Sequence, residues 1–139
     1  MIYHSIRVAW KPEVSDAQKE HALAHLRRMG REIDAVEFAC VGPDYGGEFD
    51  HGAMFAVKDI DAYREYMLAP IHREMDDIGL PLVQNMISQD LTDDEDPRVG
   101  ELIREIHASR FRDDPELLDL VNDLGSYSGS GVPAAEGSA

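Results

Sequence analysis

Apolar and polar residues alternate in three separate stretches of the first sixty residues. In residues 2–10, the more apolar face is made of every second residue: Ile2, His4, Ile6, Val8 and Trp10. Residues 36–40 and 51–57 alternate in the same way, and residues 80–90 read as a further strand. A period of two residues is typical of β-strands, so we predict four strands, with His4 pointing inward from the first.

Two stretches between these strands have helical spacing. Residues 15–18 have the form of a capping box, and apolar residues then recur at three- and four-residue intervals until Gly30. A second helix can be capped by Asp59 or Asp61 and continues to Pro70. The element order βαββαβ predicts a ferredoxin-like α+β fold, whose open sheet face needs cover.

The second helix carries a tyrosine and a histidine on either side of a proline. Six steps of about 100° along an unbroken helix would leave Tyr66 and His72 about 120° apart. Pro70 removes a backbone donor and clashes with the preceding turn, so the chain must bend there and could direct both side chains into one cavity. His72 could then act as a general base, and Tyr66 could donate to an enolate or alkoxide oxygen. Alternatively, both are structural residues, one in the core and one hydrogen-bonded.

Composition narrows the possible functions. The formal net charge is −15, from 28 acidic residues against 13 Lys and Arg, and this charge repels nucleic acids and anionic membranes. The single cysteine, Cys40, excludes an intrachain disulfide, and its apolar strand predicts a buried, inert thiol. The chain begins directly with a strand, and no apolar run approaches the ~20 residues of a membrane-spanning helix, so we expect a cytoplasmic protein.

The character of the chain changes at Thr92, where an acidic run begins. Apolar stripes in residues 99–106 and 117–124 predict two helices that must pack on something. The remaining residues are mostly Gly, Ser, Ala and Pro, which favours a flexible tail. We therefore expect three parts: an α+β barrel domain in residues 1–91, an acidic helical extension in 92–125 and a flexible tail in 126–139.

A combination of motifs resembles one known family. It consists of His4 in the first strand, His51 at the start of the third strand, a Tyr-x-x-x-Pro-x-His sequence beginning at Tyr66, and a last strand ending at Asp90. Over roughly residues 1–91 the chain resembles the Dabb family of stress-responsive dimeric α/β-barrel proteins. Within that family it is similar to polyketide cyclases of the olivetolic acid cyclase type. The resemblance implies a dimeric α+β barrel in which two subunits cover each other's sheets.

For function, the resemblance implies cofactor-independent cyclisation of a polyketide-like small molecule by an aldol-type condensation. His72 and Tyr66 would be catalytic, and His4 and His51 would contact the substrate, although the last two could equally be hydrogen-bonded histidines on a strand face. Three inward histidines could bind a metal, but no local ligand pair supports this, and we expect neither metal nor cofactor. The alternatives are a non-catalytic, stress-associated homodimer and another cofactor-free lyase or cyclase.

Overall fold

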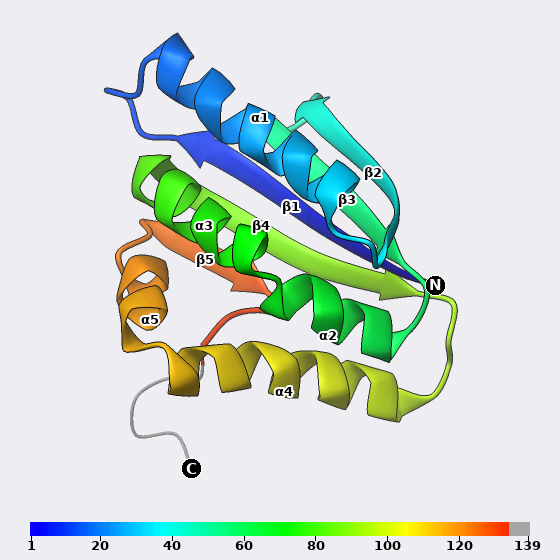
Figure 1. The fold of residues 1–139 in the computed structure, drawn as a ribbon. Coiled ribbons are helices and arrows are strands. Elements are labelled where there is room, and N and C mark those ends of the chain that lie inside the picture. The colour runs from blue at the N-terminus through cyan, green and yellow to red at the C-terminus, as the bar shows by residue number, and fades with distance from the viewer. Residues whose placement is uncertain (134–139) are drawn as a thin grey trace.

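The structure, a computed structural model, describes residues 1–133 (Figure 1). The elements follow in this order: β1 (Ile2–Trp10), α1 (Asp16–Glu32), β2 (Val36–Pro43), β3 (His51–Val57), α2 (Ile60–Leu68), α3 (Pro70–Gly79), a 3-10 turn (Leu80–Leu82), β4 (Val83–Thr92), α4 (Pro97–Asp113), α5 (Pro115–Asn122) and β5 (Ser126–Gly129). The first six helices and strands, with β4, form the predicted βαββαβ unit, with its second helix divided in two. The ferredoxin-like α+β fold is therefore confirmed.

The sheet has the order β2-β3-β1-β4-β5. β1 pairs antiparallel with both β3 and β4, β2 pairs antiparallel with β3, and β5 lies parallel to β4. The last predicted strand begins three residues later than expected, because Leu80–Leu82 form a 3-10 turn. Pro81 explains the difference, since its ring fixes φ and it has no N–H to donate to a strand ladder.

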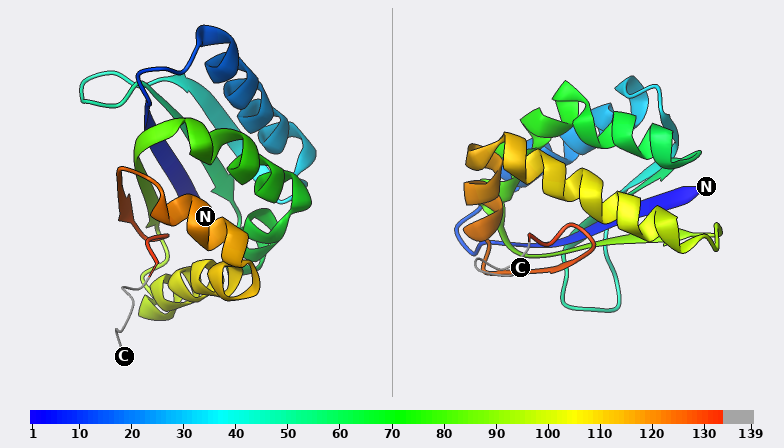
Figure 2. Two further views of the ribbon diagram at one scale, coloured as in Figure 1. Left: turned by 90° about the vertical axis from the view of Figure 1, so that its left-hand side faces the viewer. Right: turned by 90° about the horizontal axis from the view of Figure 1, so that it is seen from below.

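The helices lie on one side of the sheet (Figure 2), and the loop between β2 and β3 projects on the other side. Four of the five inward residues of β1, including His4, are buried beneath the helices as predicted, and Ile6 is half-buried. The opposite sheet face exposes Phe38, Met54 and Leu91. Cys40 also lies on that face, beside Met54, and is exposed, so the predicted burial of its thiol was wrong. Strand alternation alone does not say which face the helices cover.

The bend at Pro70 is a complete break between two helices. α2 ends at Leu68, Ala69 adopts an extended conformation with φ −62° and ψ 135°, and Pro70 is the first residue of α3. A residue before proline is driven out of the helical region by the proline ring, and proline itself is favoured at the first helical position. The same residue therefore ends one helix and begins the next.

The extension packs onto the first domain as two helices. α4 runs beside α2, and α5 packs against α3 (Figure 1). Ile103 and Ile106 of α4 are buried, and so are Leu117 and Val121 of α5, as expected for the two apolar stripes, whereas Leu102 of the first stripe is exposed.

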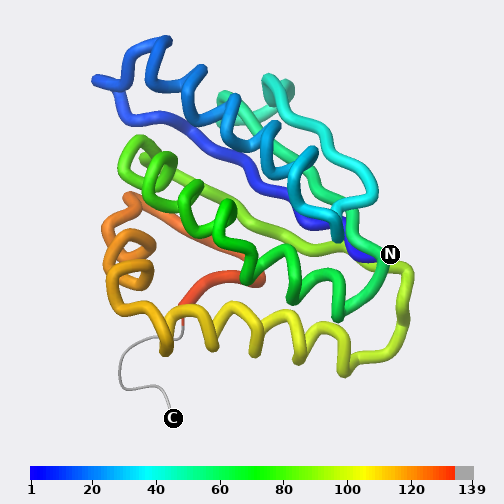
Figure 3. The backbone as a smooth tube through the Cα atoms, in the orientation of Figure 1, coloured from blue at the N-terminus to red at the C-terminus, as the bar shows by residue number. Residues whose placement is uncertain are grey.

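The structure of the residues after α5 differs from the one predicted from the sequence. The tail was expected to be flexible from residue 126, whereas Ser126–Gly129 form β5 and extend the sheet beside β4 (Figure 3). Gly129 has φ +122°, and a Cβ there would overlap the Ser88 carbonyl oxygen. The glycine that suggested flexibility therefore permits a close approach of two backbones. The remainder of the expected tail, residues 134–139, lies outside the described residues.

Candidate functional site

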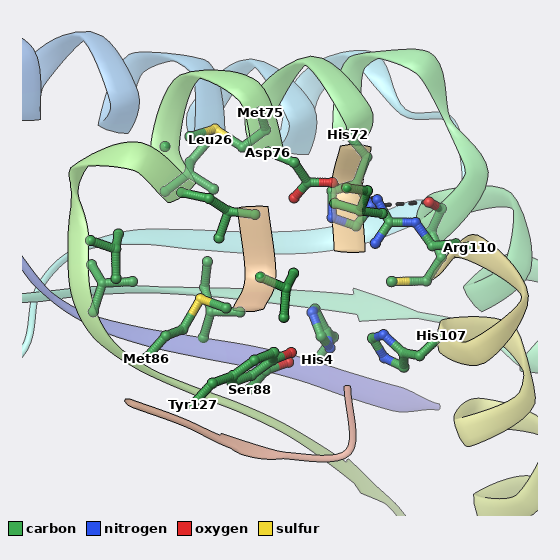
Figure 4. Close-up of a pocket in the computed structure, with 18 of the residues that line it drawn as sticks. His4, Leu26, His72, Met75, Asp76, Met86, Ser88, His107, Arg110 and Tyr127 are labelled. Carbon is green, nitrogen blue, oxygen red and sulfur yellow. Dashed lines mark hydrogen bonds and ion pairs between the residues drawn. The ribbon is translucent and has the colours of Figure 1, made fainter. Parts of the chain in front are cut away.

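A cavity of about 90 Å³ lies between the covered face of the sheet and the helices (Figure 4). Its lining is mostly apolar and includes residues from both the first domain and the extension. The polar residues that line it include His4, Tyr66, His72, Asp76, His107 and Arg110. Typical ligand pockets are roughly 300–1,000 Å³, so this cavity suits a small guest.

Three of the residues singled out in the sequence meet in this cavity. The rings of Tyr66 and His72 are stacked across the helix break, with centroids 4.9 Å apart and planes at 28°. The His4 ring reaches Tyr66 from the sheet, at a centroid distance of 5.6 Å. The break at Pro70 thus brings both side chains to one cavity, as its sequence suggested.

His51 does not line the cavity. Its Nδ1 accepts a hydrogen bond from Trp10 Nε1 at 2.9 Å, and the Trp10 ring forms part of the cavity wall. In the β1–β3 ladder His51 lies opposite Val8, four residues along the strand from the partner of His4. Four residues span about 13 Å of strand, which explains why the two histidines are separated although they share a sheet face.

His4 is hydrogen-bonded to Asp90 on the neighbouring strand. The His4 Nδ1 atom lies 2.8 Å from Asp90 Oδ1, and both side chains are 4% exposed. Because the carboxylate accepts, Nδ1 carries the hydrogen and Nε2 is the basic nitrogen. Burial on its own would raise the pKa of Asp90, but hydrogen bonds from His4 and Ser130 lower it overall. An ionised carboxylate behind an imidazole orients the ring and stabilises its protonated form.

Asp90 also connects His4 to Tyr63, which lies behind the cavity wall, and through Tyr63 to His107, which lines the cavity. The Tyr63 hydroxyl lies 3.1 Å from Asp90 Oδ2 and 2.8 Å from His107 Nε2. The hydroxyl has one hydrogen, so when it donates to Asp90, His107 must donate to the Tyr63 oxygen. Burial lowers the pKa of His107 to about 4, and burial also raises the pKa of Tyr63 far above its ordinary value. Both groups are therefore neutral near pH 7.

His72 and Tyr66 are neutral as well. Burial lowers the pKa of His72 well below 6.5, and the positive charge of Arg110 acts in the same direction. The His72 Nδ1 donates to the Met67 carbonyl at 3.2 Å, so no carboxylate stabilises a protonated His72 ring through this nitrogen. Burial, followed by the charge of Asp76, raises the pKa of Tyr66 well above 10. Tyr66 therefore keeps its hydroxyl hydrogen and can donate it.

The extension contributes one member of a charged pair, Arg110, that was not predicted from the sequence. Arg110 Nη2 on α4 lies 2.5 Å from Asp76 Oδ2 on α3, and the two side chains are 10% and 14% exposed. One signal could have found it. Ile103, Ile106, His107 and Arg110 follow the spacing i, i+3, i+4, i+7, so the inward face of the helix continues through two polar residues.

The described residues contain no obvious metal site. Between residues 1 and 133, no group of three or more His, Cys, Asp or Glu side chains is arranged to hold a metal ion. In the same part of the chain, no helix has both the length and the apolar character needed to cross a bilayer.

The fold and the cavity, with its few convergent polar groups, define a ferredoxin-like α+β protein with a small site between sheet and helices. The model of the Stress Responsive A/B Barrel Domain, Dabb, matches residues 2–93, and the chain belongs to this family. The family expected from the sequence is thus confirmed, whereas the narrower resemblance to olivetolic acid cyclase-type enzymes stays a prediction. Helices α4 and α5 and strand β5 lie beyond the matched residues.

Several solved structures have the same fold. Each match spans nearly the whole of the solved structure but only about two thirds of this chain. One is a hydroxynitrile lyase from Passiflora edulis, with a TM-score of 0.61 and 14% identity, covering 68% of this chain and 94% of that chain. Another is a dimeric ferredoxin-like protein of unknown function from Thermobifida fusca, with a TM-score of 0.60 and 22% identity, covering 66% and 89%. A Dabb family protein from Mesorhizobium loti has a TM-score of 0.59 and 17% identity, covering 66% and 94%. A comparison with curated protein sequences gave no match. These identities establish the fold and leave activity open.

Proposed function

We propose that this protein is a cofactor-independent lyase or cyclase that moves a proton on a small substrate by histidine–tyrosine acid–base catalysis. The observation that carries the proposal is the His4–Asp90 pair, whose imidazole faces the cavity within 5.6 Å of the Tyr66 ring. A buried imidazole with a carboxylate on one nitrogen and a cavity at the other suits a general base.

The geometry supports a division of roles that differs from the one suggested by the sequence. His4 is the better-placed base, because Asp90 accepts from its Nδ1 and fixes the ring beside the cavity, whereas burial and Arg110 disfavour a proton on His72. Tyr66 donates its hydroxyl hydrogen to the substrate oxygen on which negative charge develops. In this scheme the neutral His72 ring stacks on Tyr66 and fixes the orientation of the phenol.

The size of the cavity favours a small substrate over an extended polyketide-like chain. A volume of about 90 Å³ is below the usual range for drug-sized ligands. Aldol-type cyclisation needs a base and a hydrogen-bond donor to the enolate or alkoxide oxygen. Cleavage of a small hydroxynitrile needs a base that removes the hydroxyl proton as the carbon–cyanide bond breaks, and the departing cyanide then takes a proton from the protonated base. The polyketide cyclisation implied by the family resemblance therefore remains within the proposed chemistry, with a compact substrate.

We also propose that the protein is a homodimer. The sheet face opposite the helices exposes Phe38, Met54 and Leu91, which are 56%, 38% and 73% exposed. Exposed apolar side chains on one face favour association, and a symmetric pair of chains would cover both faces. Some of the similar solved structures are described as dimeric.

A non-catalytic role is the second candidate, and one observation favours it. Among the described residues, no fully buried side-chain nitrogen or oxygen lacks a hydrogen-bond partner. Full pairing is also what is expected of a polar network whose sole role is to hold a fold together. A direct test of proton transfer separates the two candidates.

The test is exchange of carbon-bound hydrogen for deuterium in a panel of small ketones, together with cleavage of small hydroxynitriles. Both are followed by NMR in the presence of the full chain. We expect the wild-type protein to accelerate at least one reaction and His4→Ala to lose about 10²–10⁴-fold of that rate. His51→Ala is the matched control, because this histidine shares the sheet face but lies outside the cavity. No acceleration across the panel, or an undiminished rate in a folded His4→Ala protein, would reject the proposal.

A further inference from the structure

The charges that line the cavity are concentrated at one end. Arg110 is the single Lys or Arg, and Asp76 the single Asp or Glu, among the described residues that line it. Figure 4 shows Asp76, His72 and Arg110 together at this end, with His4 and His107 nearer the sheet. The nearby histidines add little positive charge at neutral pH, since burial keeps His72 and His107 neutral. Arg110 is thus the permanent positive charge available to a guest molecule.

The Arg110 guanidinium has more donors than its contact with Asp76 uses. That contact is made by Nη2, whereas a guanidinium carries five N–H groups in a planar fork. Such a fork matches a carboxylate, which can accept two parallel hydrogen bonds. Burial raises the pKa of Asp76 against the opposing effect of Arg110, so the favourable partner for a ligand carboxylate here is the guanidinium itself. The contact with Asp76 leaves the other N–H groups of the Arg110 fork for that ligand.

Stability alone gives little reason for this pair. Replacing a buried ion pair by well-packed apolar residues is often neutral or stabilising. Elsewhere the contact between the extension and the first domain combines buried apolar residues such as Ile103 and Ile106 with the hydrogen bond between Tyr63 and His107. An apolar pair in place of Asp76 and Arg110 could have extended the apolar part of this contact.

We propose that Arg110 binds the carboxylate of a small organic acid, so that the substrate of the proposed acid–base reaction is a small carboxylate-bearing molecule. The carboxylate would lie at the Arg110 end, and the reacting carbon would face His4 and Tyr66. The inference deepens the proposed function and rests on it for the reaction, although the binding itself requires no turnover. It also makes α4, which lies beyond the family match, part of the binding site.

The test compares carboxylates with amides of nearly the same shape. Acetate, propionate and benzoate, and then acetamide, propionamide and benzamide, are titrated into the full-length protein, and binding is followed by calorimetry and protein NMR. We expect at least one carboxylate to bind at least tenfold more tightly than its amide, with resonance changes at Arg110 and His72. Equal affinities for every pair, or no binding of any carboxylate at millimolar concentration, would overturn the proposal.

Variants assign the preference to Arg110. Arg110→Gln should abolish the preference for carboxylate over amide, and Arg110→Lys should retain part of it. Asp76→Asn should strengthen carboxylate binding, because it removes the competing negative charge. Asp77→Asn is its matched control, since Asp77 is the next residue, is 63% exposed and pairs with Arg73. An unchanged preference in folded Arg110→Gln protein would overturn the proposal, and if that variant does not fold, weaker binding by Asp76→Asn than by Asp77→Asn would do so. Carboxylate binding without any proton exchange would reject the proposed function and leave this inference standing.

Discussion

At the scale of single residues, the site depends on which nitrogen of His4 carries hydrogen. Asp90 sets this, because its carboxylate can only accept a hydrogen bond from Nδ1. His107 and Tyr63 extend the same set of hydrogen bonds from α4 and α2. The side chains that face the cavity and the side chains behind it therefore belong to one network.

Replacing Asp90 with Asn should reduce activity with little change in shape. An amide can donate to His4 Nδ1, which places the hydrogen on Nε2 and removes the basic nitrogen from the cavity. A loss of about 10⁴-fold is known for the equivalent change in a serine protease triad, and we expect at least 10²-fold here. The proton-exchange assay gives the rate, and ¹⁵N NMR gives the His4 tautomer. Asp93→Asn is the control, because Asp93 is 79% exposed and pairs with the chain terminus. An unchanged tautomer would contradict the assignment.

Buried neutral histidines should make the fold sensitive to mild acid. The unfolded chain protonates His107 near pH 6.5, whereas the folded protein does so only near pH 4. Between these values the unfolded state binds more protons, so the free energy of unfolding falls as the pH drops from 6.5 to 4, by up to about 3 kcal/mol from this residue. His72 acts in the same direction. Asp76, whose pKa is raised, acts in the opposite direction above pH 3.8.

Urea unfolding at several pH values between 7.5 and 4.5 measures this dependence. His107→Phe should reduce the change in the free energy of unfolding between pH 7.5 and 4.5, whatever the substitution does to stability at pH 7.5. Equal pH dependence in the wild-type and variant proteins would show that His107 is not the neutral, buried group described above.

At the scale of elements, the extension completes the wall of the cavity. Helix α4 contributes His107 and Arg110, α5 contributes Leu117 and Val121, and β5 contributes Tyr127. None of these residues belongs to the segment that matches the family. The size and charge of the cavity are therefore properties of this extended chain.

The close approach of β5 to β4 provides a test of the extension. A Cβ on Gly129 would overlap the Ser88 carbonyl oxygen, and its φ of +122° is unfavourable for other residues. We expect Gly129→Ala to detach β5 and lower the free energy of unfolding by about 1–3 kcal/mol. Gly47→Ala is the control, because a Cβ there meets nothing within 4 Å. Denaturant unfolding compares the two, and equal stability would mean that β5 contributes nothing to the fold.

At the scale of the whole molecule, the uncovered sheet face is the feature that predicts assembly. Light scattering should give twice the chain mass of 15.5 kDa at micromolar concentration. Leu91→Glu should shift the protein toward monomer, because it places a charge on the shared face. Leu68→Glu, on helix α2, is also at an exposed apolar position but away from that face, and should leave the mass unchanged. A monomer mass for the wild-type protein would remove the dimeric barrel.

The sequence by itself determined the fold class and the helix break that lets Tyr66 and His72 lie side by side. Alternation at a period of two, the capping box and the two apolar stripes of the extension are local signals, and local propensity and packing agreed at each. The break at Pro70 is also local, since a proline ring acts only on its own backbone and that of its immediate neighbours. These features need no knowledge of distant contacts.

Only the tertiary structure decided the chemistry of the site. His4 and Asp90 are 86 residues apart, and their pairing depends on the register between β1 and β4. The register between β1 and β3 places His51 beside Trp10 and away from the cavity, although nothing local distinguishes it from His4. Gly129 suggested disorder because composition reports flexibility and cannot report a strand that lies against it. Burial lowers the pKa values of His72 and His107, and burial is a property of the assembled layers. The physical reason is that water stabilises a charged imidazole, and only the complete fold excludes water from these side chains.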